Sequence, residues 1–351
     1  MYNELSKLLS TGDKNTLAEL IKHYCENASF EERQNLALHA EKIRNEVYGA
    51  RVFFRGLIEV SNYCKNDCYY CGIRKGNKNA IRYRLDENQI LSSCAMGHKM
   101  GFRTFVLQGG EDAYFTDERL CSIIYKIKNE FSDSAVTLSL GERSFDSYKK
   151  LFGAGADRYL LRHETANVKH YARLHPPQLN FENRKKCLYD LKEIGFQVGA
   201  GFMVNSPYQT YKTLADDFMF LHNLQPHMVG IGPFIAHKDT RFAGVENKSS
   251  DKTVVILSLV RIMLSKALIP ATTALNSIDT KGREKGLRAG ANVLMPNLTP
   301  TIYRDNYNLY DNKLSVGLES VQGIEILKKH IEELGLIADF SRGDHKDINF
   351  I

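Results

Sequence analysis

The sequence of 351 residues lacks several features of membrane, secreted and nucleic-acid-binding proteins. It contains no run of about 18 apolar residues, the length that spans a bilayer as a helix, and its first residues form no apolar signal core. It also contains no dense block of lysine and arginine interleaved with aromatic residues. We therefore expect a cytoplasmic protein whose partners include neither a membrane nor a nucleic acid.

Some catalytic motifs are missing as well. The histidines share no metal-binding spacing such as H-E-x-x-H, and no Ser/His/Asp or Cys/His set emerges. No G-x-G-x-x-G follows the first predicted strand, where a dinucleotide-binding sheet would carry it. Hydrolytic chemistry is therefore not expected, and an open doubly wound sheet is the less favoured fold.

Cysteine is scarce, and three of the seven cysteines are clustered. Cys64, Cys68 and Cys71 form a C-x3-C-x2-C pattern directly after the apolar segment 52–60, which indicates a reducing compartment rather than a disulfide framework. Three thiolates can hold three irons of a [4Fe–4S] cluster and leave the fourth iron open. The alternatives are a zinc site, for which a second C-x2-C pair is missing, or three buried thiols. The other cysteines, which we expect to be small buried hydrophobes, are Cys25, Cys94, Cys121 and Cys187.

The composition is that of a globular protein with a sizeable core, since 43% of the residues are hydrophobic and 25% are charged. From residue 51 onward, short apolar segments alternate with helical ones, a rhythm typical of a parallel α/β sheet. Eight such units closing on themselves make a TIM (β/α)8 barrel, whose site lies at the C-terminal ends of the strands. The predicted strands are 52–60, 104–108, 135–140, 158–162, 197–203, 228–233, 269–273 and 292–296.

The remaining parts are predicted to be short appendages of this barrel. Residues 1–50 form a helical N-terminal extension, in which Asp13 and Ser29 are expected to cap helices. The barrel covers residues 51–314. Residues 315–351 form a C-terminal segment, packed on the barrel, with one helix at 323–334 and a polar tail.

Polar residues follow several predicted strands at the barrel end that would hold the site. The second strand ends at Gln108 and is followed by two glycines, which let a backbone approach a ligand closely. On the third strand, alternation places Thr137 and Ser139 on one face. On the fourth strand, the same period aligns Arg158 with Arg162 and with the following carboxylate, so the charges pair with each other or bind a zwitterion.

The cysteine loop resembles the signature of the radical S-adenosylmethionine (SAM) enzymes, and Tyr70 before the last cysteine fits that pattern. The resemblance narrows to the [FeFe]-hydrogenase maturase HydE family, which belongs with biotin synthase and methylornithine synthase. The segments that carry it are VLQGGEDAYF, VTLSLGE, ADRYLLRHETAN, FENRKKCL, HMVGIGPFIAHKDT, IPATTA and GANVLMPNLTP.

The resemblance implies that Cys64, Cys68 and Cys71 hold a [4Fe–4S] cluster whose free iron takes the amino and carboxylate groups of SAM. The residues it implies around SAM are Tyr70, Gln108, Gly109, Gly110, Glu111, Thr137, Ser139, Glu164, Arg184 and Met203. Those it implies along the inner substrate cavity are Arg162, Thr272, Thr273, Met295, Asn297, Tyr307 and Tyr310.

The resemblance further implies cleavage of SAM to a 5′-deoxyadenosyl radical in assembly of the di-iron subcluster. The implied substrate is a cysteine-bound iron carbonyl cyanide from a companion maturase, HydG, and the implied electron donor is a ferredoxin or flavodoxin. The net charge of +6 suits such a small anionic substrate.

The sequence departs from the family pattern at one place, and two alternative functions stay open. Residues 311–327 carry none of the cysteines that hold a second cluster in some family members, which leaves room for a HydE-like paralogue. A biotin- or methylornithine-synthase-like enzyme acting on a small amino acid is one alternative. A non-catalytic iron–sulfur carrier or scaffold is another, although such a carrier would be expected to have a fourth cysteine.

Overall fold

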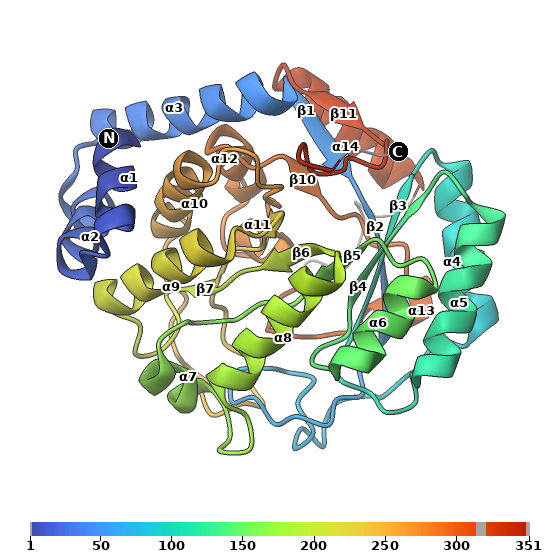
Figure 1. The fold of residues 1–351 in the computed structure, drawn as a ribbon. Coiled ribbons are helices and arrows are strands. Elements are labelled where there is room, and N and C mark those ends of the chain that lie inside the picture. The colour runs from blue at the N-terminus through green and yellow to red at the C-terminus, as the bar shows by residue number, and fades with distance from the viewer. Residues whose placement is uncertain (1, 314–320, 349–351) are drawn as a thin grey trace.

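A ring of parallel strands forms the centre of the molecule in this computed structural model, which describes residues 2–313 and 321–348 (Figure 1). Six strands pair in the order β2-β3-β4-β5-β6-β8, and β1 pairs with β10. Two further strands, β7 (Met203–Val204) and β9 (Gly232–Pro233), extend the ring toward its C-terminal end. The other bounds are β1 (Arg51–Phe54), β2 (Gly56–Ser61), β3 (Thr104–Gly109), β4 (Ala135–Ser139), β5 (Arg158–Leu160), β6 (Gln197–Ala200), β8 (Met228–Val229) and β10 (Val293–Leu294).

Backbone hydrogen bonds close this ring between β8 and β2. The amide of Val229 donates to the carbonyl of Leu268 at 3.0 Å, and the amide of Ala271 donates to the carbonyl of Val293 at 3.0 Å. The bridges that complete the circle are Met228 with Leu268, Pro270 with Val293, and Leu57 with Asn297. The predicted TIM-type barrel is therefore confirmed, and the open doubly wound sheet is excluded.

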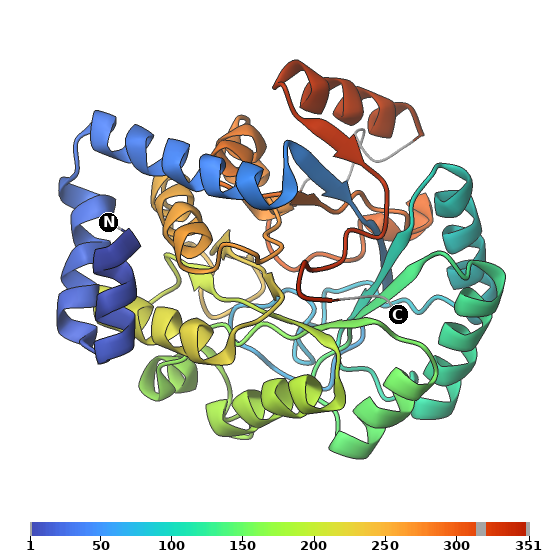
Figure 2. The same ribbon diagram turned by 45° about the horizontal axis from the view of Figure 1, so that its top comes forward.

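Amphipathic helices cover the outside of the barrel (Figures 1 and 2). Asp86 and Thr116 begin two of them, each accepting a backbone N–H of the first turn. The outer helices are α4 (Glu87–Lys99), α5 (Asp117–Glu130), α6 (Phe145–Gly153), α8 (Phe181–Ile194), α9 (Tyr211–Leu224), α10 (Asp251–Met263) and α12 (Gly282–Arg288). Three short helices that the sequence did not predict are α7 (Val168–Leu174), α11 (Thr273–Ile278) and α13 (Thr301–Arg304).

The N-terminal helices pack against the outer side of the barrel, away from the cysteine loop (Figure 1). They are α1 (Tyr2–Thr11), α2 (Lys14–Lys22), a π-helical turn η1 (His23–Asn27) and α3 (Phe30–Tyr48). Both predicted N-caps are confirmed, since Asp13 accepts the amide of Thr16 and Ser29 accepts the amide of Glu32. No helix in the described ranges combines the length and apolarity needed to cross a bilayer.

Several predicted strands are shorter or broken in the structure. The segment 52–60 is interrupted at Arg55, and 197–203 breaks after Ala200. The second break arises because Gly201 has a φ of 154° and lies so close to Gly230 that a Cβ would stand 2.0 Å from its carbonyl oxygen. The prediction of a strand to residue 273 was wrong, because Thr272 caps α11 and its hydroxyl accepts the amide of Leu275.

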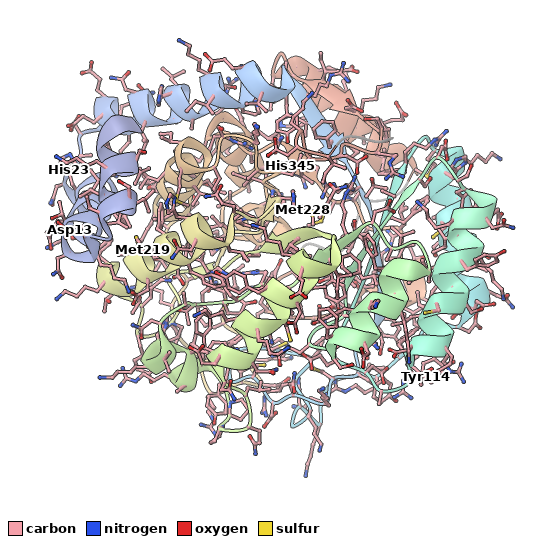
Figure 3. The ribbon with its side chains drawn as sticks, viewed as in Figure 1. Asp13, His23, Tyr114, Met219, Met228 and His345 are labelled. Atoms are coloured by element: carbon pink, nitrogen blue, oxygen red, sulfur yellow. The ribbon has the colours of Figure 1, made fainter. Side chains whose placement is uncertain are left out.

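The C-terminal tail crosses the N-terminal end of the barrel, opposite the cysteine loop (Figure 2). After α14 (Val321–Glu333), β11 (Ile337–Asp339) adds to β1. Asp344 then accepts hydrogen bonds from the Arg158 guanidinium at 2.5 Å and from the Gln197 amide at 2.7 Å. Figure 3 shows His345 of this tail near Met228 in the middle of the molecule. The predicted boundary between residues 314 and 315 lies outside the described residues.

Arg158 therefore does not share a ligand-binding region with Arg162. Four residues of extended chain separate the two side chains by about 13 Å along the barrel axis. Arg158 is fully buried against the tail, whereas Arg162 lies at the cavity near the other end. The prediction that the two arginines act together was therefore wrong, because Arg158 pairs with the tail and only Arg162 lines the cavity.

Replacement of Asp344 by alanine is expected to lower the free energy of unfolding by about 3 kcal/mol, because it leaves the buried Arg158 charge without its carboxylate. Denaturant titration measures the change. The control is Asp347→Ala, whose carboxylate pairs with Lys266 at the surface and should cost less than about 1 kcal/mol. Equal losses in the two variants would show that the tail does not stabilise the barrel through this pair.

Candidate active site

A cavity of about 240 Å³ opens at the C-terminal ends of the strands, where a TIM barrel places its site. The cysteine loop forms one wall, and the rest comes from β7, from the segments at or after the ends of β3, β4, β5, β9 and β10, and from α8 and α11. The predicted site residues on its wall are Cys64, Cys68, Tyr70, Cys71, Gly109, Gly110, Glu111, Arg162, Glu164, Arg184, Met203, Tyr307 and Tyr310.

The three cysteines lie half-buried on one loop at the cavity, and none forms a disulfide. Burial raises the pKa of all three thiols, to about 12 for Cys71, and the neighbouring thiols oppose ionisation of Cys68 further. Adjacent thiolates in such a place need bound positive charge to be stable. In the described part of the chain, no set of three or more Cys, His, Asp or Glu converges on a single metal ion. The donor set fits an iron–sulfur cluster with one cysteine on each of three irons.

Arg82 holds the cysteine loop in shape through four backbone carbonyls. Its guanidinium donates to the carbonyls of Asn62 at 2.5 Å, Ile73 at 2.8 Å, Arg74 at 2.7 Å and Asn77 at 3.2 Å. An arginine can bind several carbonyls at once because it carries five donors in a fixed plane. This role could not be predicted, since an arginine that binds only backbone carbonyls leaves no pattern of side chains in the sequence.

The segment at the end of β3 lies so close to the cysteine loop that only glycine fits at position 110. A Cβ on Gly110 would stand 2.2 Å from the carbonyl oxygen of Tyr63 and 2.7 Å from the Cβ of Cys64. The Gly-Gly pair after β3 therefore serves close packing against the cluster loop, in addition to any contact with SAM.

The Gly110→Ala variant is expected to displace the cysteine loop at a cost of about 1–3 kcal/mol, with less iron retained after anaerobic reconstitution. Iron and sulfide per chain measure the effect. Gly153→Ala is the matched control, because a Cβ there meets nothing within 4 Å and should leave the iron content unchanged. Full iron content in Gly110→Ala would contradict the steric argument.

A network of charges joins three sides of the cavity. Arg184 donates to Glu142 at 2.5 Å and to the carbonyl of Arg162 at 2.9 Å. Glu111 is buried, accepts the amide of Glu142 at 3.0 Å and pairs with Lys65 at 3.1 Å. The guanidinium of Arg184 thus already has partners within the protein, and it fixes the backbone at Arg162 after β5.

Like Glu111, whose Oε2 has no hydrogen-bond partner among the described residues, Arg162 and Glu164 are charged residues of the cavity with hydrogen-bonding capacity to spare. The side chains of Arg162 and Glu164 lie 3.1 Å apart. Nη2 of Arg162 and Oε2 of Glu164 form this ion pair without hydrogen-bond geometry, and Nε of Arg162 is buried with no hydrogen-bond partner among the described residues. Glu164 also has a φ of 64°, a strained conformation that is typical of functional sites. An ion pair at the cavity wall whose hydrogen bonds are incomplete fits a ligand that carries an amino and a carboxylate group.

Seven predicted site residues are not on the wall of this cavity. Thr137 is buried with no hydrogen-bond partner for its hydroxyl among the described residues, and Gln108 and Ser139 pair in register on the adjacent strands. Thr272 and Thr273 begin α11, and Met295 packs against an apolar cluster deeper in the barrel. The amide of Asn297 donates to Glu59 at 2.9 Å.

Glu59 is a site feature that the sequence analysis missed. It is fully buried inside the barrel and pairs with Lys313 at 2.5 Å, while Lys313 also donates to the carbonyl of Tyr307 at 2.9 Å. Burial raises the pKa of Glu59, although Lys313 acts against that shift. A single glutamate in the otherwise apolar segment GLIEVS was the available signal. The pair ties the segment that carries Tyr307 and Tyr310 to the barrel wall.

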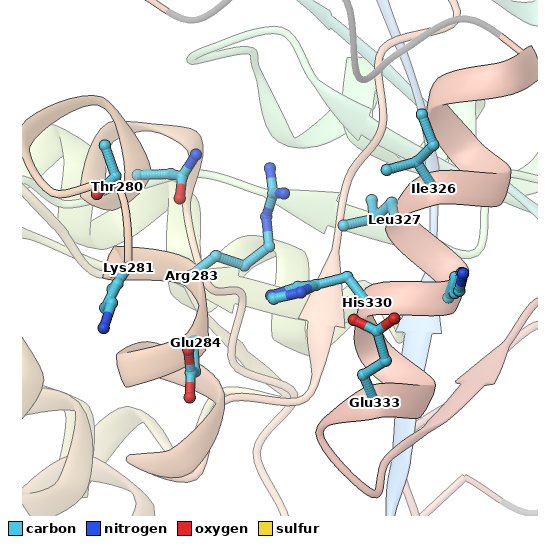
Figure 4. A pocket seen from close by; sticks show the side chains of 10 residues that line it. Thr280, Lys281, Arg283, Glu284, Ile326, Leu327, His330 and Glu333 are labelled. Carbon is cyan, nitrogen blue, oxygen red and sulfur yellow. The ribbon is translucent and has the colours of Figure 1, made fainter.

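A larger cavity lies elsewhere. It has a volume of about 610 Å³ and separates the α11–α12 region from α14 on the outside of the barrel (Figure 4). None of the predicted site residues lines it. Convergent polar groups and strained backbone are found at the smaller cavity, which is therefore the candidate active site.

The fold and the cysteine loop define an iron–sulfur enzyme class, and comparison with known proteins agrees. The model of the radical SAM superfamily matches residues 58–221. Methylornithine synthase (PylB) has a similar fold, with a TM-score of 0.77 at 24% identity over 92% of this chain and 93% of that chain. The chain is thus a radical SAM enzyme, and a [4Fe–4S] cluster and SAM are its cofactors.

Two characterised relatives define the family more narrowly. The chain is 46% identical to the [FeFe] hydrogenase maturase subunit HydE of Thermotoga maritima over 296 residues, 84% of either chain. It is 30% identical to 3-methylornithine synthase of Methanosarcina acetivorans over 88% of this chain and 86% of that one. The chain therefore belongs to the HydE family of radical SAM enzymes, and the carrier alternative is not supported.

Proposed function

We propose that this enzyme acts in maturation of an [FeFe]-hydrogenase, on a cysteine-bound iron carbonyl cyanide that a companion maturase of the HydG type supplies. The 46% identity to HydE supports the pathway. The observation that carries the site assignment is the Arg162–Glu164 ion pair at the cavity, whose hydrogen bonds are incomplete and which can bind the carboxylate and amino groups of a cysteine or of SAM. A cytoplasmic location goes with this proposal.

Cys64, Cys68 and Cys71 would hold the cluster, which would supply one-electron reduction of SAM there. The work of the chain is to bind, orient and exclude water. Gly109 and Gly110 let the backbone approach SAM. Tyr70, held by His175 at 3.2 Å, excludes water beside the cysteines.

Arg162 is assigned to the anionic part of the substrate, since its Nε and Nη2 remain available next to the cavity. Tyr307 and Tyr310 close the opposite side and are fixed by the Glu59–Lys313 pair. Four predicted substrate residues do not line this cavity, and we assign them a structural role around it. They are Thr272, Thr273, Met295 and Asn297.

A second candidate is an enzyme that acts on a small free amino acid. The 30% identity to 3-methylornithine synthase and the zwitterion-binding character of Arg162 and Glu164 favour it. Both candidates share the radical chemistry and differ in the substrate.

The experiment compares SAM consumption by the reconstituted, dithionite-reduced enzyme with different additions. A synthetic cysteine-bound iron carbonyl cyanide should raise the rate of 5′-deoxyadenosine formation at least about tenfold over the rate without substrate. Free cysteine and a mixture of free amino acids are the controls. Acceleration by an amino acid alone would overturn the maturase proposal in favour of the second candidate.

A further inference from the structure

The cysteine loop carries most of the positive charge excess of the whole chain. Residues 62–84 contain six lysines and arginines and one aspartate, a net charge of +5 against +6 for all 351 residues. The loop lies at the lower edge of the molecule in Figure 1, at the C-terminal end of the barrel. The excess is therefore concentrated around the place where the cluster would bind.

Part of this charge is used inside the protein. Arg82 binds backbone carbonyls, Arg84 pairs with Asp112 at 2.7 Å, and Arg74 pairs with Asp67 at 2.8 Å. Lys75 and Lys78 are exposed, and neither has an ion pair with a carboxylate in the part of the chain that the structure describes. These two lysines are free to meet a partner.

Two neighbouring segments bring further free charge to the same surface. Arg173 at the end of α7 and Lys238 and Arg241 in the loop after β9 are exposed, and they too form no ion pair within the described residues. We call the five residues Lys75, Lys78, Arg173, Lys238 and Arg241 the basic rim.

Contacts hold the basic rim against the cysteine loop. The guanidinium of Arg241 lies 3.5 Å from the centre of the Tyr69 ring, and Tyr69 directly follows Cys68. The amide of Tyr69 donates to the carbonyl of Leu174 at 3.0 Å, which fixes the end of α7 beside the loop. Arg74 donates to the carbonyl of Asp239 at 3.1 Å and so fixes the other segment.

An apolar contact point stands within this charged surface. Tyr208 is 53% exposed, and the Arg173 guanidinium lies 4.0 Å from the centre of its ring. An exposed aromatic residue surrounded by charges is the usual composition of a transient protein interface.

We propose that the basic rim is the docking surface for an acidic one-electron carrier protein. This inference rests on the proposed SAM chemistry, which requires one electron from outside in each turnover. The carrier's redox group is oxidised by one electron, and that electron breaks the sulfonium C–S bond to give methionine and the deoxyadenosyl radical. Negative charges around the carrier's redox group would meet the basic rim and orient that group toward the cysteine loop.

The test is the affinity of the reconstituted holoenzyme for a recombinant flavodoxin, measured by calorimetry at low and at high salt. The triple variant Lys75→Glu, Lys78→Glu, Arg241→Glu should bind at least about tenfold more weakly than wild type and lose most of the salt dependence. The matched control, Lys7→Glu, Lys42→Glu, Arg288→Glu, changes the net charge equally on other surfaces and should bind normally. Cluster content and thermal melting confirm folding, and Lys78→Glu alone should give a partial loss.

A second readout separates this inference from the proposed function. With dithionite in place of flavodoxin, the rim variant should form 5′-deoxyadenosine at the wild-type rate. Failure of the wild type itself with dithionite would reject the SAM chemistry, whereas unchanged flavodoxin affinity in the rim variant would reject the docking surface. The docking proposal would also be overturned if the rim variant bound duplex DNA or anionic vesicles more weakly than wild type but bound flavodoxin equally well.

Discussion

Replacement of Cys68 by alanine should abolish cluster binding, with iron and sulfide per chain falling to background after anaerobic reconstitution. Cys68 lies between the other two cysteines of the loop, and a cluster held by two thiolates has two open irons and exchanges readily. Iron and sulfide analysis with the visible absorbance spectrum measures the loss.

The matched control for this variant is Cys121→Ala. Cys121 is half-buried on α5, and its thiol lies 3.6 Å from the carbonyl oxygen of Lys150, far from the cysteine loop in sequence. It should retain the wild-type iron content. Equal iron in Cys68→Ala and wild type would remove the loop from the cluster site.

The Arg162→Leu variant should keep its cluster and lose turnover by about 100-fold, because a ligand then lacks its charged hydrogen-bond donors. Turnover is measured as 5′-deoxyadenosine formed in the presence of substrate, and the iron content is measured beside it. Arg162→Lys should restore part of the rate, since it keeps the charge without the planar donor pair.

Arg119→Leu is the matched control for Arg162→Leu. Arg119 is exposed on α5 and stacks on the Tyr114 ring at 4.3 Å, so its loss should leave turnover unchanged. Wild-type turnover in Arg162→Leu would place Arg162 outside the site, and loss of the cluster would show that its role is structural.

The barrel could be predicted from the sequence because each strand is a local apolar run with glycine or polar residues at its end. The cysteine loop, Gly110 and Glu111 could be placed for the same reason, since they directly follow such runs. The position of a side chain along the barrel axis could not be predicted, because the alternation of residues in a strand indicates only which face a side chain lies on. Arg158 and Arg162 share a face, yet only Arg162 reaches the cavity.

The remaining features depend on contacts between distant parts of the chain. Lys313 reaches Glu59 across 254 residues of sequence, and Asp344 reaches Arg158 across 186. No local pattern marks such partners. The family resemblance implied a place along the substrate cavity for Thr272, and in the structure its hydroxyl caps a helix that the strand pattern did not predict.

The most direct test of the central claim is 5′-deoxyadenosine formation by the anaerobically reconstituted enzyme with SAM and dithionite, scored by chromatography. The account predicts deoxyadenosine from the wild type and none from Cys68→Ala. A wild-type enzyme with a full cluster that leaves SAM intact under these conditions would contradict the assignment of this cavity to radical SAM chemistry.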